Sequence, residues 1–406
     1  MKKNFEGKAI LLPMTVKESS SLLSLSLFLL TGIFYLNFIS RIALAPLLSI
    51  VEIDLGLGHG EAGSLFFYVA AGYATGLLTS GYITARIVHR RMITLSAAMV
   101  GFAMLGLSLS PSIGVIRGGL FLVGTFAGFY LPSGIAALTE LFPKELWGRV
   151  MAIHELAPNV AFITAPLLAE GLLKFFSWRS TLSFIGASSL LIGVLFLVFG
   201  RGGSDKGAPP SSHSMGTVMA RPQFWTMVIF FMMAIGASLG LYTLLSLFLV
   251  SEIQFERGTA NMLIGLSRIS ASFVLLLSGF LTDRLGAKKA MMALLSATGV
   301  SILLLGLFKG PIVTGILLFL QAASVVCLFP IGFTIISLLF PSELRSVAVS
   351  LIIFMGFLLG GGMVPAAIGH WAEAFSFSSG FILLGILFLA LLPFLHRSIK
   401  EPNPHK

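Results

Sequence analysis

Two arginines that lie inside long apolar stretches are the residues of this chain best placed to do chemistry. Arg41 and Arg268 each fall within an apolar run, and no matching pair of carboxylates lies equally deep. A guanidinium in hydrocarbon costs on the order of a few kcal/mol unless it meets water, an anion or a partner. It binds carboxylates and oxyanions through two parallel hydrogen bonds. The pair predicts a positive cavity that receives a small anion; the alternative, above all for Arg41, is a side chain that extends to the lipid headgroups.

The segment HELAPN, which begins at His154, combines titratable groups with a helix breaker. Glu155 and Asn159 are four residues apart and would share one face of a helix. Pro158 has no N–H to offer the carbonyl of His154, which predicts a kink where these groups lie. An imidazole or a carboxylate in a wet cleft can take up and release a proton in each cycle. We expect His154, Glu155 and Asn159 to form a proton-coupling group in which the imidazole or the carboxylate exchanges the proton; the alternative is an ion pair of Glu155 with Arg149 or another cation.

The composition predicts that lipid, rather than water, surrounds most of the chain. Of its 406 residues, 56% are hydrophobic and 10% are charged, and the mean hydropathy is +0.99, whereas about a quarter of a soluble domain is charged. These values exclude a disordered chain and disfavour a soluble enzyme. The net charge of +10 does not indicate nucleic-acid binding, because the basic residues lie between apolar runs. The single cysteine, Cys327, excludes an intrachain disulfide.

Apolar runs predict an all-α membrane protein with twelve transmembrane helices, since one span needs about 20 apolar residues. The runs lie near 22–48, 60–83, 92–110, 115–141, 148–171, 178–199, 224–250, 260–281, 289–308, 311–340, 346–369 and 377–396. Gly, Pro and Ser are frequent in residues 200–223, which predicts a flexible linker between two six-helix halves, 22–199 and 224–396. Residues 1–21 and 397–406 are the expected tails.

The basic residues predict the orientation of these spans. Of the 26 Lys and Arg, 19 fall in the tails, the linker and the loops on the same side, and five fall in the loops on the other side. Positively charged loops stay in the cytosol. Both tails and the linker are therefore expected to be cytosolic, in a cell (inner) membrane.

The two halves repeat at an offset of 198 residues. The stretch SGYITARIVHRR from Ser80 aligns with SGFLTDRLGAKK from Ser278, and FPKEL from Phe142 aligns with FPSEL from Phe340. An offset shared by several helices predicts two six-helix units of the same orientation, which is a parallel repeat.

With these features the chain resembles the major facilitator superfamily over essentially its whole length. The most specific likeness is a loop motif of that family, in which Gly, three residues, Asp, Arg, one residue and Gly precede basic residues. The second copy, in the 8/9 loop, fits with Gly279, Asp283, Arg284 and Gly286, followed by two lysines. The first copy, in the 2/3 loop, keeps Gly81 and Arg86 but has Ala85 and Val88 where Asp and Gly are expected.

The resemblance implies a twelve-helix secondary transporter in which these loops take part in gating. The 8/9 loop would meet the cytosolic end of helix 5, so that Asp283 helps to hold the inside closed. A carboxylate near a helix N-terminus is favourable by up to about 1 kcal/mol. The alternative is a solvated loop that only sets the topology.

The resemblance also implies that helices 1, 4, 7 and 10 line the substrate path. Polar residues on these helices are the candidate substrate contacts, together with Arg41 and Arg268. They are Tyr35, Asn37, Tyr130, Tyr242, Thr243 and Gln321. Asn37 and Arg41 are four residues apart and share a helical face. For any single tyrosine the alternative is simple packing, with the hydroxyl satisfied locally.

We therefore expect a secondary transporter that moves a small anionic metabolite, a carboxylate or an inorganic anion, by alternating access with proton symport. The alternative is a proton antiporter that exports drugs or other amphiphiles, which the 36 Phe and 16 Met favour. The spans lack an HExxH helix, a Ser/His/Asp set and a phosphate-binding loop, so we expect no enzyme. No cofactor, metal or nucleic acid is expected, and the expected partners are the anion, protons and the lipid bilayer around a monomer.

Overall fold

The computed structural model describes residues 16–399 except 208, 210 and 211, and it leaves out the side chains of 16–21, 212, 276–283, 342, 343 and 346. Within these residues the chain is helical apart from turns and one isolated bridge between Val88 and Lys206. Both Gly279 and Asp283 belong to the segment whose backbone alone is described. The prediction that the Asp283 carboxylate takes part in gating therefore concerns a side chain that lies outside the described part of the structure.

The described helices fall into two sets separated by the linker. The first set is α1 (Val16–Ile42), η1 (Ala45–Leu47), α2 (Leu48–Leu55), α3 (His59–Thr84), α4 (His89–Ser108), α5 (Ile113–Gly128), α6 (Tyr130–Leu141), η2 (Lys144–Leu146), α7 (Trp147–His154), α8 (Leu156–Leu173) and α9 (Trp178–Phe199). The second is α10 (Ser212–Met219), α11 (Pro222–Ile235), η3 (Gly236–Gly240), α12 (Leu241–Ser251), α13 (Arg257–Leu285), α14 (Ala287–Leu307), α15 (Pro311–Val326), α16 (Leu328–Leu339), α17 (Ser342–Gly356), η4 (Phe357–Met363), α18 (Val364–Ala374) and α19 (Phe377–Ser398).

Twelve of these helical segments have the length of membrane spans. In the described part of the chain, 11 are long and apolar enough to cross a bilayer, several of them built from two or three consecutive helices. The eighth position is taken by α13, which has 29 residues and carries Arg268 within its apolar sequence. The prediction of twelve spans in two six-helix halves is confirmed, and the chain is an integral, multi-pass membrane protein.

The two halves share the positions of their helix breaks as well as the positions of their helices. The bounds of α5 and α15, and those of α6 and α16, lie 198 residues apart at both ends. In each half a proline, Pro132 or Pro330, stands in the first turn after the break, where its missing N–H is tolerated. This agreement supports the parallel repeat at the level of local structure.

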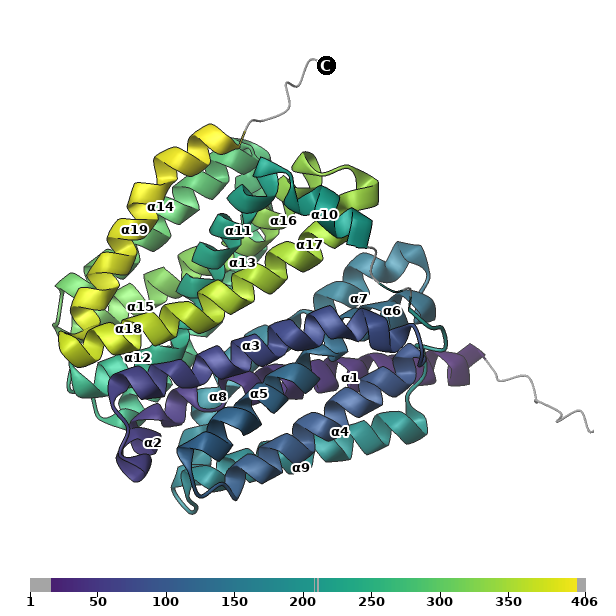
Figure 1. Cartoon of the computed structure of the whole chain (residues 1–406), viewed down its shortest axis with the longest axis horizontal. Coiled ribbons are helices and arrows are strands. Elements are labelled where there is room, and N and C mark those ends of the chain that lie inside the picture. Colours follow the sequence, from purple (N-terminus) through teal and green to yellow (C-terminus); the bar gives the residue numbers. More distant parts are fainter. Residues whose placement is uncertain (1–15, 208, 210–211, 400–406) are drawn as a thin grey trace, which may run out of the picture.

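The two halves lie side by side and touch along α3 and α18 (Figure 1). We call the end of the molecule that carries the linker the linker end, and the opposite end the far end. Inter-half polar contacts join the halves toward the far end: Gly60 N donates to the Glu373 carboxylate at 3.1 Å, and Asn261 donates to Glu170 at 2.6 Å. The ribbons diverge toward the linker end (Figure 1). The far end is therefore the closed one.

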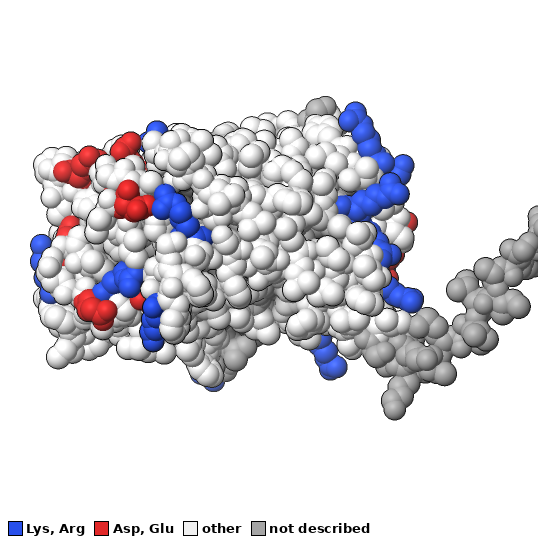
Figure 2. Space-filling model, turned by 90° about the horizontal axis from the view of Figure 1, so that it is seen from below, with Lys and Arg blue, Asp and Glu red and all other residues white. Residues whose placement is uncertain are grey.

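Charged side chains gather at the two ends of the molecule. Figure 2 shows mainly Lys and Arg at one end, mixed charges at the other, and an uncharged belt between them. Trp147 and Trp178 begin α7 and α9. Trp225 and Trp371 lie in the first turn of α11 and near the end of α18. Indole rings prefer the headgroup level, so the belt has the expected character of a membrane-embedded surface.

The first part of the predicted linker is held against the first half. The backbone N–H groups of Gly203 and Ser204 donate to the Glu140 carboxylate at 2.7 and 2.9 Å, and Arg90 N donates to Gly203 O at 2.8 Å. Gly203 has φ of +74°, a conformation that other residues rarely adopt. Glycine here shapes a turn around a carboxylate, so this stretch differs from the flexible chain that its composition predicts.

Small residues allow α3 and α5 to approach closely. A Cβ on Gly76 would lie 2.1 Å from Thr125 O, and one on Gly124 would lie 2.1 Å from Val69 O. We expect Gly76→Ala to force the two helices apart and to lower the free energy of unfolding by about 1–3 kcal/mol. Thermal unfolding in detergent would measure the loss. Gly118→Ala on α5 is the matched control, because nothing lies within 4 Å of its added Cβ; equal melting temperatures for both variants would contradict the close packing.

Candidate functional site

Arg41 lies in the last turn of α1 and is buried, with 6% of its surface exposed. Its Nε donates to the Asn37 carbonyl at 3.4 Å. Its guanidinium carbon lies 4.0 Å from the ring centre of Tyr73 and 4.7 Å from that of Phe38, and Phe357 of the second half is 5.6 Å away. Aromatic faces and the free carbonyls at a helix C-terminus both stabilise a cation. The charge is thus held inside the protein rather than at the headgroups.

Arg268, on α13, is buried in the second half with 5% of its surface exposed. Its Nη2 donates to Ser238 O at 3.2 Å, and its Nε is buried without a hydrogen-bond partner among the described residues. The rings of Phe162 and Tyr242 lie 4.9 and 5.1 Å from its guanidinium carbon. The side chain therefore points into the protein, and the lipid-facing alternative does not hold.

The π-helical turn η3 organises the surroundings of Arg268. A π-helical turn has an irregular hydrogen-bond pattern, and such turns frequently occur at functional sites. Here the carbonyl of Ala237 accepts Gln321 Nε2 at 2.8 Å, next to the Ser238 carbonyl that accepts Arg268. The Tyr242 hydroxyl, one turn further, donates to Phe162 O of the first half at 3.1 Å. Three predicted substrate contacts, Arg268, Tyr242 and Gln321, thus meet around one π-helical turn.

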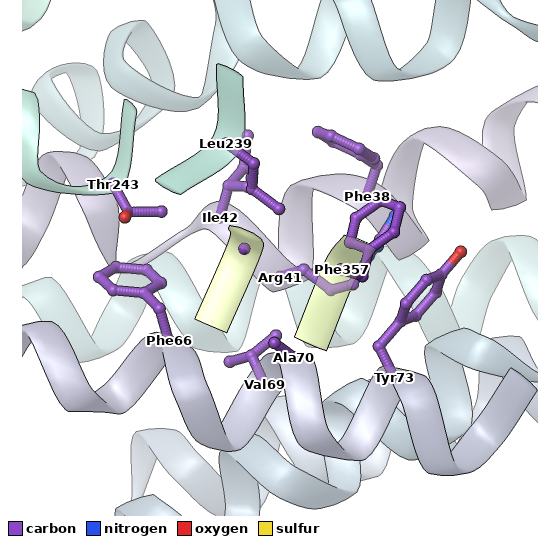
Figure 3. Close-up of a pocket in the computed structure, with 11 residues that line it drawn as sticks. Phe38, Arg41, Ile42, Phe66, Val69, Ala70, Tyr73, Leu239, Thr243 and Phe357 are labelled. Atoms are coloured by element: carbon purple, nitrogen blue, oxygen red, sulfur yellow. The ribbon is translucent and has the colours of Figure 1, made fainter. Parts of the chain in front are cut away.

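A small cavity lies beside Arg41 where the two halves meet (Figure 3). Its walls come from α1 and α3 of the first half and from η3, α12 and η4 of the second half. They are Phe38, Arg41, Ile42, Phe66, Val69, Ala70, Tyr73, Leu239, Thr243, Phe357 and Gly361. Its volume of about 20 Å³ has room for about one water molecule. An anion can enter here only when the halves or the side chains move.

Two phenylalanine rings connect the arginines across the inter-half boundary. Phe38, which packs on Arg41, meets Phe162, which packs on Arg268, edge to face at 4.9 Å between ring centres. Among the described residues no carboxylate lies within 4.0 Å of either guanidinium. Each half thus contributes one buried cation that aromatic faces, rather than an acid, stabilise.

Other predicted contacts point away from this pair. The Asn37 side chain donates to Ser96 on α4 at 3.2 Å, so sharing a helical face with Arg41 does not bring it to the cavity. The Tyr35 hydroxyl lies 2.8 Å from the Thr164 hydroxyl on α8. Both groups have partners inside the first half, which agrees with the packing alternative for Tyr35.

Tyr130 instead joins the predicted proton-exchanging group. Its hydroxyl donates to Leu30 O at 2.6 Å and lies 3.0 Å from His154 Nε2. His154 is fully buried, whereas 59% of the Glu155 side chain is exposed, and Nδ1 of His154 lies 3.7 Å from Oε1 of Glu155. In the described structure His154 is the ion-pair candidate of Glu155 and Arg149 is not.

The helix is interrupted where Pro158 predicts a kink. α7 ends at His154, Glu155 stands between the helices, and α8 starts at Leu156. Asn159 donates from its side chain to the Glu155 carbonyl at 3.2 Å. Asn159 therefore stabilises the break and presents no side-chain contact to His154.

The loop-motif residues lie at the linker end. Gly81 is in the last turn of α3 and Arg86 is exposed in the turn before α4. Gly286 has φ of +79° directly before α14, which explains why this motif position requires glycine. Arg284 is exposed in the last turn of α13.

Sequence reasoning missed the aromatic residues that cover the arginines. Phe38 precedes Arg41 by three residues, a spacing that places both on one helical face and offered a signal. Tyr73, Phe162 and Phe357 approach from other helices, and nothing in their local sequence distinguishes them from lipid-facing residues.

Comparison with known proteins shows which protein family the sequence matches. A sequence model of the Major Facilitator Superfamily matches residues 27–275 and 240–406. The nitrite extrusion protein of Bacillus subtilis (strain 168) is 23% identical over 260 residues, which cover 63% of this chain and 64%, less than two thirds, of that protein. The cis,cis-muconate transport protein of Acinetobacter baylyi is 23% identical over 382 residues, covering 88% of this chain and 90% of that protein.

A solved structure shares the fold. The bacterial homologue of the human lysosomal transporter Spinster, in an inward-facing and occupied conformation, aligns with a TM-score of 0.76 and 15% identity. The alignment covers 93% of this chain and 96% of that one. These matched proteins are described as transport or extrusion proteins and not as enzymes.

Proposed function

The chain belongs to the major facilitator superfamily, and from this premise we propose that it is a secondary carrier of a small anion, a carboxylate or an inorganic anion, that works by alternating access. The observation that carries the proposal is the pair Arg41 and Arg268. Each is buried, each comes from a different half, and neither has a carboxylate partner in the described structure. Aromatic faces compensate a buried charge only partly. An anion that enters between the halves would complete the compensation.

The names of two related proteins support an anionic cargo. Nitrite is an inorganic anion and cis,cis-muconate carries two carboxylates, and both names belong to proteins that this chain matches. Their shared chemistry is negative charge on oxygen atoms. A guanidinium recognises such oxygens through paired N–H donors.

Coupling, topology and assembly complete the proposal. Protons enter with the anion through His154 and Glu155, at the helix break that Asn159 stabilises, and the loops with Gly81, Arg86 and Asp283 take part in gating at the linker end. The linker end faces the cytosol of a cell (inner) membrane, as the positive charges there favour. The linker, residues 200–223, joins halves 22–199 and 224–396, and the carrier is a monomer in the bilayer.

A thermal-shift panel tests the cargo class. Purified protein in detergent is heated with nitrate, nitrite, acetate, succinate or muconate, each as the sodium salt at equal ionic strength. A ligand at 100 times its Kd stabilises the folded state by about 2.7 kcal/mol, which raises the melting temperature measurably. At least one anion should do so, and uptake of that anion into proteoliposomes should follow. If no carboxylate or inorganic anion raises the melting temperature, the anion assignment fails.

Export of amphiphiles is the second candidate, and the apolar walls of the cavity favour it. Phe66, Leu239 and Phe357 present only apolar surface beside Arg41. Tetraphenylphosphonium, a hydrophobic cation, belongs in the same panel. Stabilisation by this cation, without any by the anions, would replace the first function with the second.

A further inference from the structure

We propose that His154 is a proton-binding site, in which Nδ1 of the imidazole takes up the proton and Glu155 delivers it from the linker end. The inference deepens the proposed function, because coupling has meaning only in a carrier. The site itself is a statement about one side chain and can be tested without any cargo.

The hydrogen bonds around Tyr130 fix which nitrogen of His154 carries hydrogen. The Leu30 carbonyl can only accept, so the Tyr130 hydroxyl must donate its single hydrogen to it across 2.6 Å. The Tyr130 oxygen is then an acceptor toward His154 Nε2 at 3.0 Å. Nε2 must therefore be the protonated nitrogen of the neutral ring, which leaves the lone pair on Nδ1.

This lone pair is buried and has no hydrogen-bond partner among the described residues. The nearest charged group is the Glu155 carboxylate, whose Oε1 lies 3.7 Å from Nδ1. A buried acceptor without a donor is unfavourable in hydrocarbon surroundings. Nδ1 is thus poised to accept a proton, and Glu155 is placed to supply it.

The surroundings also fit the charged ring. Phe34 of α1 stacks on the imidazole at 4.4 Å with an interplanar angle of 5°. Among the described residues, the titratable groups in contact with the ring are Tyr130 from α6 and Glu155 from the break between α7 and α8. After proton uptake the imidazolium would face an anionic carboxylate on one side, a hydroxyl oxygen on another and an aromatic face on the third.

The proton transfer is balanced within the pair. A proton bound to the Glu155 carboxylate moves to Nδ1, so that an O–H bond breaks, an N–H bond forms, and a neutral pair becomes an imidazolium–carboxylate pair. Glu155 is 59% exposed, so in the proposed route its carboxylate is the group that takes up the next proton from the linker end. Pro158 has no N–H with which to continue the helix, and the helix is interrupted at Glu155, directly after His154. In a regular helix the side chains of adjacent residues do not face each other.

Nitrogen-15 NMR of the full chain in lipid, with histidine labelled, tests the tautomer directly. The spectrum of the parent minus that of His154→Gln isolates the His154 signals. The signals of the neutral ring should show a protonated Nε2 and an unprotonated Nδ1, and the second proton of the charged ring should be found on Nδ1. Tyr130→Phe removes the acceptor and should release the ring into a mixture of tautomers. A neutral ring protonated on Nδ1, or a ring that shows no doubly protonated form at any pH at which the protein stays folded, would overturn the proposal.

Proteoliposomes with an internal pH dye test the coupling. Inward gradients of nitrate and succinate are imposed as probes, and counterflow of the same anions is measured in parallel. His154→Gln should lose anion-driven proton entry but keep counterflow, and Glu155→Gln should slow proton entry by about tenfold or more. His89→Gln is the matched control, because His89 contacts Ser133 at the same end without joining this group. If His154→Gln moves protons as the parent does, the proton-binding site is refuted. If the carrier transports neither nitrate nor succinate, the NMR result alone decides whether His154 binds the proton on Nδ1.

Discussion

Arg268→Ala is expected to abolish anion binding while the carrier still folds. The guanidinium supplies a buried charge and a free Nε donor beside the inter-half boundary. Removing one partner of a buried, hydrogen-bonded charge pair costs about 2–5 kcal/mol, which corresponds to a loss in affinity of about 30-fold to several thousandfold. The fold should persist, because Arg268 forms no ion pair in the described structure and donates to one carbonyl only. Affinity is measured with the anion that gives the largest thermal shift.

Two further variants separate charge from geometry. Arg268→Lys keeps the charge but not the planar fork, so its affinity should fall between those of the parent and of Arg268→Ala. Arg179→Ala is the control, because Arg179 pairs with Asp54 at the exposed far end, where an ion pair contributes at most about 1 kcal/mol. Gel filtration checks that each variant is folded. Normal transport by Arg268→Ala would refute the anion site and leave the carrier architecture untouched.

The span architecture was predictable because lipid imposes a simple rule. A span needs a long apolar run, and the 198-residue offset relates the second set of runs to the first. The helix break at Glu155 was predictable too, since Pro158 removes a specific hydrogen bond. The π-helical turn η3 was not, because its sequence, GASLG, carries no residue that forbids an ordinary helix.

Side-chain partners were much less predictable than burial. The depth of Arg41 and Arg268 followed from their place in apolar runs. Asn37, one turn from Arg41, has a short side chain that reaches only the adjacent helix α4, where Ser96 binds it. The longer guanidinium extends to the boundary between the halves. The contact of Tyr130 with His154 joins two helices of the first half, and spacing along one helix cannot reveal it.

The second large effect is expected at the far end, where two carboxylates hold the halves together. Glu170, at the end of α8, accepts from Asn261 at 2.6 Å and pairs with Arg257 at 3.2 Å, both at the start of α13. Glu373, near the end of α18, accepts from Gly60 N at 3.1 Å at the start of α3. These contacts are related by the repeat, because α3 and α13 occupy equivalent places in the two halves.

The two contacts differ in how they bind the carboxylate. Glu170 meets charged and amide side chains, whereas Glu373 meets the free N–H groups at a helix N-terminus, where a negative charge is favourable. A Cβ on Gly60 would lie 2.1 Å from His370 Nδ1 and 2.6 Å from Glu373 Oε2. Glycine at this position therefore admits the carboxylate to the helix end.

The double variant Glu170→Ala and Glu373→Ala should shift the carrier toward an arrangement that is open at the far end. A hydrogen bond to a charged group contributes about 1.5–3 kcal/mol, so loss of two should change the ratio of closed to open molecules by about 100-fold or more. A labelling assay measures this ratio. Replacing Cys327 by alanine gives a parent without cysteine. Ala70→Cys then introduces a single thiol in the cavity wall, where Ala70 is 4% exposed.

A membrane-impermeant maleimide, added from the far end, reports the shift as a faster labelling of that thiol. Glu61→Ala is the matched control, because Glu61 lies at the same end but pairs with Arg117 inside the first half. It removes a carboxylate without removing an inter-half contact, so labelling should stay at the parent rate. Equal labelling of the double variant and this control would mean that apolar packing of α3 against α18, rather than the two carboxylates, keeps the far end closed. The carboxylates would then contribute to the fold of each helix end but not to the transport cycle.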